Sequence, residues 1–318
     1  MLTQLFILLY FFLMIKRIIQ QTKHFVNKTS TVLQYNYLRL KIAYPVKMPF
    51  NEMSRTISVA IPHYNGSRMA HVALFNILND PRIAEIVFLD DGSKPEEFNK
   101  LKTKLQPLAQ KVKLFRRDVN RGPFANKIQA VELCTSDWLV LLDYDNTLLP
   151  EYLDTIFNLP EWEKSTIYCP GYAYPHFDFR ESLGEKDIDL NSTSAMINSG
   201  DFKGEFFNDG NYFLHRDSYI QTVKPFWNYS VFAADVIFAI YLWLSSQNTL
   251  KVLQNSRYIH RIHGGSSWVN MGESERAFNT IKKRLQAKSN PYSESLNNDF
   301  SKTSNKWIEP TRISLHEN

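Results

Sequence analysis

Two aspartates, Asp143 and Asp145, stand one residue apart where a short apolar run ends. The run, residues 138–142 (WLVLL), is bounded by polar residues, which is the pattern of a strand buried on both faces. Two ionised carboxylates at the edge of an apolar core are costly unless a cation or hydrogen-bond donors satisfy them. Hard oxygen ligands suit Mg²⁺ or Mn²⁺, which complete their shells with water and substrate phosphates. The pair therefore predicts a seat for a metal–diphosphate complex; alternatively, the aspartates cap the turn that follows.

Buried strands and helices alternate in the sequence that leads to this acidic pair. The strands are predicted at 57–62, 83–89, 112–115 and 138–142. Helices are predicted at 69–78, after the second strand as far as residue 108, and at 124–133. This alternation predicts an α/β fold with a mostly parallel central sheet and helices on both faces. Ligands of such sheets bind outside the carboxyl ends of the strands. Polar clusters follow all four strands, at 63–67, 90–93, 120–122 and 143–146. We therefore expect the clusters to converge on one rim.

These clusters, in this order, resemble those of the family 2 glycosyltransferases, whose Rossmann-like nucleotide-sugar-binding fold is called GT-A. The motifs that carry the resemblance are Pro62-His63-Tyr64-Asn65, Asp90-Asp91-Gly92-Ser93, Asn120-Arg121-Gly122 followed by Lys127, and Asp143-Tyr144-Asp145. Lys127 departs mildly from the pattern, because the family usually has arginine there. The resemblance is specific over 57–153 and continues more loosely to about residue 267.

The resemblance implies a role for each motif. Asp91 would accept a hydrogen bond from the nucleobase, and Lys127 would offer positive charge to the diphosphate or the base. Asp143 is expected near the ribose and the metal, and Asp145 as a direct ligand of Mn²⁺ or Mg²⁺, which helps the nucleoside diphosphate to leave. Asp90 is interpreted as a structural turn residue instead. The implied contacts to the nucleotide sugar are Pro62, Tyr64, Asn65, Asp91, Lys127 and Asp143, although Tyr64 could also be plain core packing.

The second half of the chain should supply the catalytic base. Asp235 opens a long apolar helix at the point where the family has an acidic pair whose aspartate is the general base, but Ala234 replaces the acidic neighbour. The alternative is a favourable charge at a helix N-terminus. The basic, glycine-containing loop 257–268 follows a predicted strand, and we expect His263 to contact the metal or the phosphates, with His260 and Arg261 as alternates. Residues 168–208 show no clear period and form either part of an acceptor cleft or a surface insertion.

The amino-terminal run 5–15 is continuously apolar and is followed by Lys16 and Arg17. A spanning helix needs about 20 apolar residues, and no small-residue cleavage site follows. We therefore expect an uncleaved membrane anchor, with a buried or interfacial helix as the alternative. The positive residues after the run favour the cytoplasmic side for the rest of the chain. The predicted organisation is an anchor helix (1–20), a stem (21–54), a GT-A domain (55–287) with a nucleotide-binding half (55–153) and an acceptor half (154–287), and a polar, flexible tail (288–318).

The bulk properties are those of a globular protein, with 44% hydrophobic and 22% charged residues. A net charge of +5 is compatible with binding to an anionic small molecule or an anionic membrane surface. The sequence contains no arginine-rich tract of the kind that would predict nucleic-acid binding. The two cysteines, Cys134 and Cys169, lie in apolar segments, which predicts buried free thiols.

The sequence therefore predicts a membrane-associated, metal-dependent inverting glycosyltransferase. It would move a sugar from a nucleoside-diphosphate sugar to a hydroxyl group of a glycan, lipid or protein acceptor. Two alternatives stay open. A nucleotidyltransferase would carry a glycine-rich basic loop after its first strand, of which 63–68 is only a faint version. A degenerate binding protein with this fold is suggested by Ala234 and Lys127.

Overall fold

The computed structural model describes residues 55–184, 186–262, 271–303 and 306–315 of the 318-residue chain. The predicted anchor helix (1–20), the predicted stem (21–54) and His263 lie outside the described residues. In the part of the chain that the structure describes, no helix is both long enough and apolar enough to cross a membrane. Cys134 and Cys169 are buried and free, as predicted.

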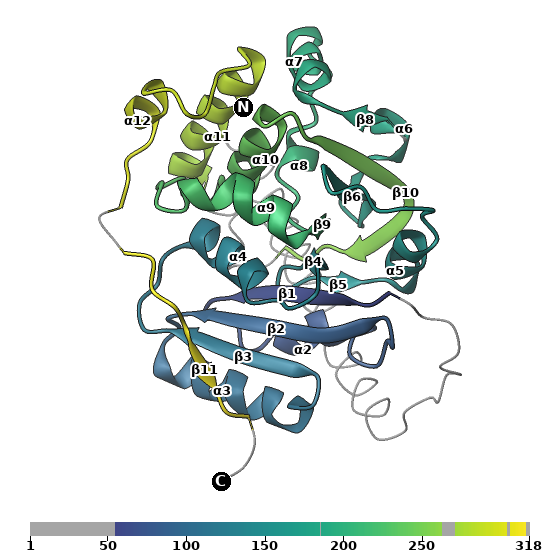
Figure 1. The fold of residues 1–318 in the computed structure, drawn as a ribbon, viewed down its shortest axis with the longest axis vertical. Coiled ribbons are helices and arrows are strands. Elements are labelled where there is room, and N and C mark those ends of the chain that lie inside the picture. The colour runs from purple at the N-terminus through teal and green to yellow at the C-terminus, as the bar shows by residue number, and fades with distance from the viewer. Residues whose placement is uncertain (1–54, 185, 263–270, 304–305, 316–318) are drawn as a thin grey trace, which may run out of the picture. The chain divides into compact units, whose positions relative to one another are not determined.

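The first half of the domain confirms the predicted alternation of strands and helices (Figure 1). Its elements are β1 (Ile57–His63), α2 (Ala70–Leu74), β2 (Ile83–Asp91), α3 (Pro95–Leu105), η1 (Gln106–Leu108), β3 (Val112–Arg117), α4 (Pro123–Glu132), β4 (Trp138–Leu141), β5 (Thr147–Leu148) and α5 (Pro150–Phe157). Every residue of β1 is buried, as its continuous apolar run predicts. Helix α2 ends at Leu74, before the predicted end, and Asn76 just beyond it adopts a left-handed conformation with φ 71°.

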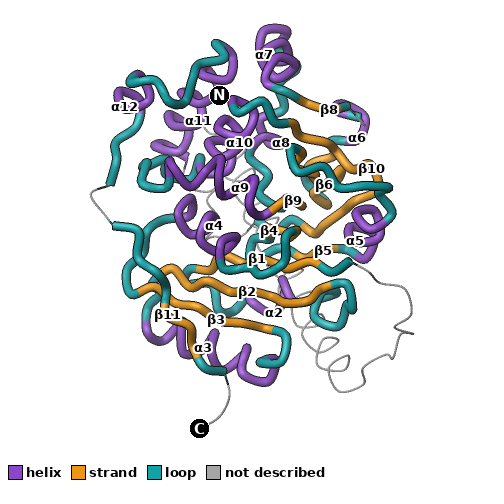
Figure 2. Tube along the Cα trace, in the orientation of Figure 1, coloured by secondary structure: helices purple, strands orange, loops and turns teal. Residues whose placement is uncertain are grey.

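The order of the strands reverses at β1. Strands β3, β2, β1 and β4 lie side by side in that order, and all their pairings are parallel. The crossovers through α2 and α3 move one way along the sheet, and the crossover through α4 moves the other way. Because such crossovers are right-handed, α4 lies on the face opposite α2 and α3; Figure 2 shows α4 beside β1. Ligands of open α/β sheets bind at this kind of reversal.

The second half adds strands of both directions to the same sheet. Its elements are β6 (Thr166–Tyr174), β7 (Phe177–Asp178), α6 (Arg180–Leu183), β8 (Asp187–Ile188), α7 (Leu190–Ser199), α8 (Gly204–Phe207), β9 (Phe213–His215), α9 (Arg216–Val223), η2 (Lys224–Phe226), α10 (Asp235–Ser245), β10 (Thr249–Ile259), α11 (Met271–Gln286), α12 (Ser295–Asp299) and β11 (Thr311–Ile313). The order over the described residues is β11-β3-β2-β1-β4-β9-β6-β10-β5, with β9 antiparallel to both β4 and β6. The prediction of a mostly parallel sheet is right for β3-β2-β1-β4 and for the pair β6-β10, but β9 and the short strands β5, β7, β8 and β11 pair antiparallel. An apolar run reports burial and not strand direction.

Two further expectations differ from the structure. The predicted loop from residue 257 begins inside β10, which continues to Ile259 because it pairs in parallel with β6. The predicted flexible tail (288–318) contains α12 and β11, and β11 pairs antiparallel with β3. Both segments are polar or basic, and they gain regular structure from strands that are distant in the sequence. The segment 168–208, whose sequence shows no clear period, contains most of β6 and the elements from β7 to α8.

Helix α10 is buried on every side, as its nearly uniform apolar sequence requires. Its first residue, Asp235, is only 5% exposed although it is acidic. A carboxylate at a helix N-terminus is stabilised by the unpaired backbone N–H groups there. Burial of the whole helix therefore fixes the position from which this carboxylate projects.

Candidate active site

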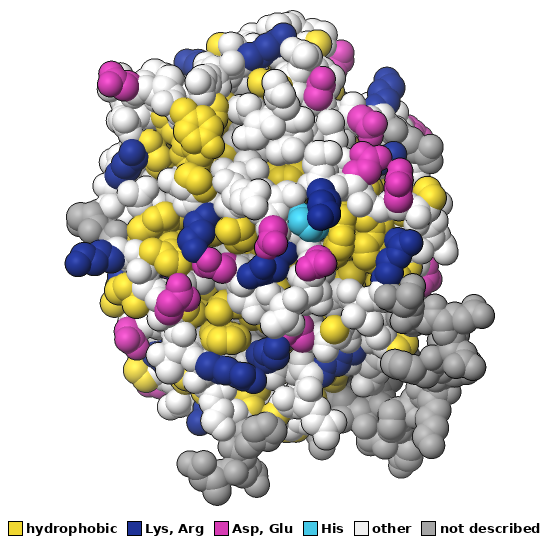
Figure 3. Space-filling view, viewed as in Figure 1, with side chains coloured by type: hydrophobic (Ala, Val, Ile, Leu, Met, Phe, Trp, Pro, Cys, Tyr) yellow, Lys and Arg dark blue, Asp and Glu magenta, His cyan; other side chains and the backbone are white. Residues whose placement is uncertain are grey.

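A cavity of about 280 Å³ opens at the carboxyl ends of β1, β2 and β4. It is lined by residues that the sequence analysis selected, namely Pro62, Tyr64, Asp91, Lys127, Asp143, Asp145 and Asp235. In the space-filling view, acidic and basic side chains and a histidine gather near the middle of the face, where Figure 1 labels α4 and β4 (Figure 3). The predicted convergence of the polar clusters on one rim is therefore observed.

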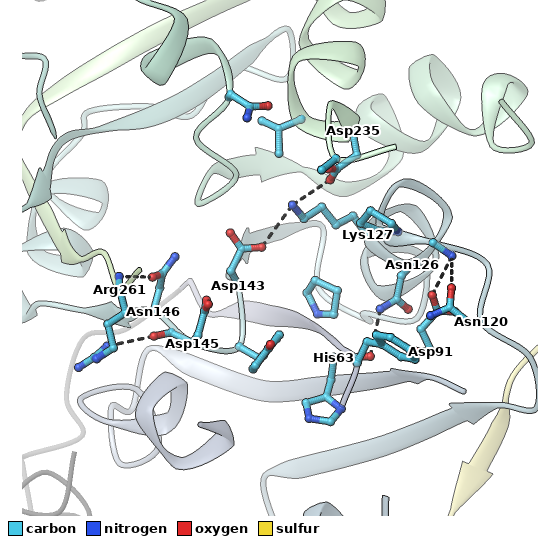
Figure 4. Close-up of a pocket in the computed structure, with 18 of the residues that line it drawn as sticks. His63, Asp91, Asn120, Asn126, Lys127, Asp143, Asp145, Asn146, Asp235 and Arg261 are labelled. Carbon is cyan, nitrogen blue, oxygen red and sulfur yellow. Dashed lines mark hydrogen bonds and ion pairs between the residues drawn. The ribbon is translucent and has the colours of Figure 1, made fainter. Parts of the chain in front are cut away.

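Lys127 lies between two carboxylates that come from different halves of the domain (Figure 4). Its Nζ is 3.3 Å from Asp143 Oδ1 and 3.0 Å from Asp235 Oδ2. Burial by itself lowers the pKa of Lys127, but the two carboxylates outweigh burial and the net pKa is raised, so this side chain is cationic at neutral pH. Burial raises the pKa of Asp143, and Lys127 opposes that shift. The two ion pairs form a bridge in the cavity that runs from Asp143 through Lys127 to Asp235.

The acidic loop after β4 is held from behind by a buried polar network. The side chain of Asn211 accepts hydrogen bonds from the Asp143 backbone N–H (3.1 Å) and from Asn146 Nδ2 (3.4 Å). Asp209 accepts two bonds from Asn211 and one from the hydroxyl of Tyr258. Burial raises the pKa of Asp209 to about 6, against the hydrogen bonds that lower it. This network fixes the direction in which Asp143 and Asp145 leave the strand.

Tyr144, between the two aspartates, packs against the turn that follows β1. Its ring meets His63 edge-on at a centroid distance of 5.1 Å. A Cβ on Gly66 would lie 2.0 Å from the Tyr144 ring, so any larger residue would force that ring to move. His63 Nδ1 is 2.9 Å from Asp90 Oδ1, and His63 Nε2 accepts from the Gly66 backbone N–H. The expectation that Asp90 is a structural turn residue is confirmed.

Asp91 lines the cavity but already accepts three hydrogen bonds. The donors are Arg117 Nη1 (2.8 Å) and the backbone N–H groups of Arg121 (3.0 Å) and Gly122 (2.9 Å). Burial raises the pKa of Asp91, and Arg117 opposes this shift. Two carboxylate oxygens offer about four acceptor positions. The carboxylate can therefore take one more donor from a ligand.

Asn65 is the described residue that the sequence analysis placed in the site and the cavity lining does not include. Its backbone N–H donates to Ser93 Oγ (2.7 Å), and its Oδ1 accepts from the Lys94 backbone N–H (2.9 Å). Asn65 therefore joins the turn after β1 to the turn after β2. The structure gives it a positioning role.

Two alternates named for the basic loop line the opposite side of the cavity. The backbone N–H of Arg261 donates to Asn146 Oδ1, and its guanidinium donates to the Asp145 carbonyl oxygen (3.1 Å) and to Thr147 Oγ1 (2.8 Å). Burial lowers the pKa of Arg261 to about 10, which leaves it cationic at neutral pH. Burial lowers the pKa of His260 to about 4, so its imidazole is neutral there. Arg261 thus places a positive charge beside the acidic loop.

A divalent cation fits the chemistry of this loop. Asp143 and Asp145 both line the cavity and offer carboxylate oxygens, which are hard ligands. Among the described residues no group of three or more His, Cys, Asp or Glu side chains could hold a metal. Mg²⁺ commonly takes only one or two carboxylates and completes its shell with substrate phosphates and water. The donor set therefore fits a metal that binds together with a diphosphate.

Several lining residues escaped the sequence analysis. The amides of Asn126 and Asn208 face the cavity region, and in the described part of the chain neither Oδ1 atom has a hydrogen-bond partner. Buried acceptors of this kind usually pair with a ligand or water. A Cβ on Gly210 would lie 3.1 Å from Lys127 Nζ, so this glycine leaves room for the bridge. Asp209 and Asn211 stand just after the segment 168–208, and the polar trio Asn208-Asp209-Gly210 was the available signal.

Comparison with known proteins identifies the same family that the sequence motifs resemble. The family model described as "Glycosyl transferase family 2" matches residues 58–223, slightly more than half of the chain. The "Uncharacterized glycosyltransferase MG060 homolog" of Mycoplasma pneumoniae is 30% identical over 109 residues, which cover 33% of this chain and 36% of that protein. This chain therefore matches only about a third of the length of that relative.

Solved structures show the same fold at low sequence identity. GalNAc-T7, crystallised with UDP, GalNAc and Mn²⁺, aligns with a TM-score of 0.54 at 16% identity, over 73% of this chain and 48% of that one. Staphylococcus aureus TarS 1–349, in complex with UDP-GlcNAc, aligns with a TM-score of 0.53 at 14% identity, over 76% and 74%.

Proposed function

Because this chain belongs to glycosyl transferase family 2, we propose that it transfers a sugar from a nucleoside-diphosphate sugar to an acceptor hydroxyl with inversion at the anomeric carbon. The observation that carries the proposal is the cavity in which Asp91, Lys127, Asp145 and Asp235 meet. Lys127 places a positive charge between Asp143 and Asp235 in this cavity, which suits an anionic diphosphate.

Asp235 is proposed as the general base. It would accept the proton of the acceptor hydroxyl while that oxygen attacks the anomeric carbon and the bond to the diphosphate breaks. In the structure Lys127 neutralises Asp235 through their ion pair. A bound diphosphate competes for the ammonium group, because its phosphate oxygens carry more charge than one carboxylate. Movement of Lys127 toward the diphosphate would leave Asp235 free to take the proton.

Asp143 and Asp145 are proposed to hold Mn²⁺ or Mg²⁺. When bound, such a metal neutralises charge on the departing diphosphate. Arg261 adds a positive charge on the same side, and its bonds to the Asp145 carbonyl oxygen and Thr147 keep it in place. His263 stays a proposed contact to the metal or phosphates. The neighbours crystallised with UDP suggest a uridine donor, which this proposal extends to the present chain.

The acceptor is proposed to enter from the side of Asn208, Ala233 and Val236, which line the cavity around Asp235. Membrane attachment through residues 1–20 is also proposed, on the strength of the apolar run alone. Membrane fractionation of the full chain beside a chain lacking these residues tests the attachment, and equal recovery of both in the soluble fraction would refute it.

The central test is release of nucleoside diphosphate. The purified chain, with Mn²⁺ and a panel of nucleotide sugars, should release nucleoside diphosphate from at least one donor, and Asp145→Ala should reduce this at least about a hundredfold because charge stabilisation of the leaving group is lost. Asp154→Ala removes a surface carboxylate that pairs with Arg82 and serves as the matched control. Binding of a donor without release from any of them would instead show a binding protein.

A further inference from the structure

The C-terminal residues 306–313, called the strap here, lie along the edge of the sheet beside β3, the strand that ends at Arg117. Strand β11 within the strap lies beside β3 (Figure 1) and pairs antiparallel with it. Thr311 stands opposite Arg116 in this pairing. The strap is anchored further up by Trp307, whose ring meets Trp227 edge-on at 5.1 Å. Nearly two hundred residues separate β3 from β11 in the sequence. The contact is therefore a product of the tertiary fold.

A continuous series of hydrogen bonds runs from the strap to the cavity, part-buried at Ile308 and buried from Gln129 to Asp91. The carbonyl oxygen of Ile308 accepts from Gln129 Nε2 (3.1 Å), and Gln129 Oε1 accepts from Arg117 Nε (2.5 Å). Arg117 Nη2 donates to the Ala125 carbonyl oxygen (2.9 Å), and Nη1 donates to Asp91 Oδ1 (2.8 Å). Gln129 and Asp91 are each 1% exposed. The Gln129 and Asp91 side chains are therefore shielded from bulk water, whereas Ile308, at the strap end of the series, is exposed.

The strap and Arg117 together fix which way the Gln129 amide points. An amide has one accepting and one donating end, and Arg117 can only donate. The Ile308 carbonyl oxygen takes the donating end and so directs the accepting end toward Arg117. Without that carbonyl oxygen, the donating end of the amide would lose its partner, and Arg117 alone would favour this orientation. A flipped amide would set N–H groups against the guanidinium and displace it.

Arg117 in turn compensates the negative charge of Asp91 and holds its carboxylate in place. Asp91 is desolvated, and Arg117 is its cationic partner, with a nitrogen–oxygen distance of 2.8 Å. Removal of one partner from a buried ion pair leaves an uncompensated charge. With Arg117 in place, Asp91 has one acceptor position to offer a ligand in the cavity.

We infer that the strap is a positioning element of the donor site, which acts through Gln129 and Arg117 to orient Asp91 toward a ring N–H group of the nucleobase. The inference rests on the proposed function and adds a determinant of nucleotide affinity outside residues 58–223, which the family model matches. It also specifies the ligand class, because a uracil or guanine ring carries such an N–H group, whereas cytosine and adenine present an acceptor there.

The test separates binding of the nucleobase from binding of the diphosphate. The full chain and its Gln129→Met variant are titrated calorimetrically, in Mn²⁺, with UDP, GDP, CDP, ADP and inorganic pyrophosphate. Gln129→Met keeps the side-chain length and removes both amide bonds. UDP or GDP should bind the parent protein more tightly than CDP and ADP do. In the variant, the dissociation constant of that nucleotide should rise roughly tenfold and that of pyrophosphate should stay unchanged.

Gln286→Met is the matched control, because Gln286 donates one exposed hydrogen bond to Asn198, on a surface away from the cavity lining. Trp307→Ala, which loosens the strap, should weaken nucleotide binding in the parent and have little additional effect in Gln129→Met. An unchanged nucleotide affinity in Gln129→Met, or an equal loss of pyrophosphate and nucleotide binding, overturns the inference. If Asp145→Ala abolishes binding and Gln129→Met does not alter it, only the strap inference fails; if the parent protein binds none of these ligands, the proposed function fails with it.

Discussion

The two walls of the cavity differ in how their side chains are held. The first wall, contributed by residues 55–153, is made of turns at strand ends that bond to themselves or to the next turn. The second wall, contributed by residues 154–262, is made of side chains placed by contacts between distant segments. Asp90 bonds the backbone of Ser93 three residues away, whereas Arg261 bonds the carbonyl oxygen of Asp145, which is 116 residues away.

This difference explains why only the first wall has a legible sequence. Its turns need particular residue types because the backbone demands them. Gly92 has a φ of 68°, and a Cβ there would lie 2.7 Å from the Asn120 backbone nitrogen of the neighbouring turn. Such a position tolerates only glycine. The second wall needs a charge or an amide at a point in space, and many sequences can supply one.

The substitution with the largest expected effect is Asp235→Asn, which keeps the shape of the second wall and removes its proposed base. Sugar transfer should fall about 10²–10⁴-fold, the usual contribution of a general base. Nucleoside-diphosphate binding should be retained, because the proposed contacts through Asp91, Lys127 and the metal ligands belong to the first wall. Transfer is measured by release of nucleoside diphosphate in the presence of acceptor, and binding by calorimetry.

Asp217→Asn provides the control, since Asp217 is also an acidic residue in the first turn of a helix but is exposed and pairs with Arg216. It should leave transfer unchanged. An Asp235→Asn variant that transfers sugar within a few-fold of the parent rate would place the base elsewhere and remove the functional distinction between the two walls.

Asp209→Asn tests whether the second wall contains a carboxylate whose ionised form is destabilised by burial. Its folded pKa of about 6 lies above its ordinary value of 3.8, mainly because of burial. The stability that its protonated form contributes is present below about pH 4 and is lost as the pH rises through 6. Relative to Asp209→Asn, the parent protein should therefore lose up to roughly 3 kcal/mol between pH 4 and pH 7. Urea unfolding of both proteins at the two pH values measures this, and a difference independent of pH would contradict it.

Asn211→Ala should uncouple the walls, because Asn211 joins Asp209 to the backbone of the acidic loop. The substitution leaves the part-buried backbone N–H of Asp143 without its acceptor. We expect a loss of about 1–3 kcal/mol in the free energy of unfolding and weaker metal-dependent nucleotide binding. Asn198→Ala, at an exposed bond to Gln286, is the control. Equal effects from the two variants would show that Asn211 has no special place in the site.

Gly66→Ala probes the first wall, where the smallest of these effects is expected. The new methyl group would meet the Tyr144 ring at 2.0 Å and force that ring to move. A loss of about 1 kcal/mol in unfolding free energy should accompany weaker nucleotide binding. Gly272→Ala, in a helix with no atom within 4 Å of the added methyl, should be neutral or slightly stabilising. Unaltered nucleotide binding in Gly66→Ala would mean that Tyr144 does not shape the site.

Much of the site was predictable where local chemistry governs it. The sequence analysis located Pro62, Tyr64, Asp91, Lys127, Asp143, Asp145 and Asp235, and all of them line one cavity. It placed Asn65 in the site rather than between the turns, because sequence spacing cannot tell a lining side chain from one that ties two turns together. It also missed Asp209 and Asn211, since their partners come from Asp143 and Tyr258 through long-range packing.

By itself, the sequence determined the parallel strands β3-β2-β1-β4 and the polar turns after them, because continuous apolar runs and glycine-dependent turns are properties of short segments. Tertiary structure alone decided the direction of β9, the addition of β11 to the sheet, and the meeting of Lys127 with Asp143 and Asp235. These features depend on which distant segments share a buried boundary. No local pattern encodes that choice, because the free energy that selects it is gained only when the whole core is packed.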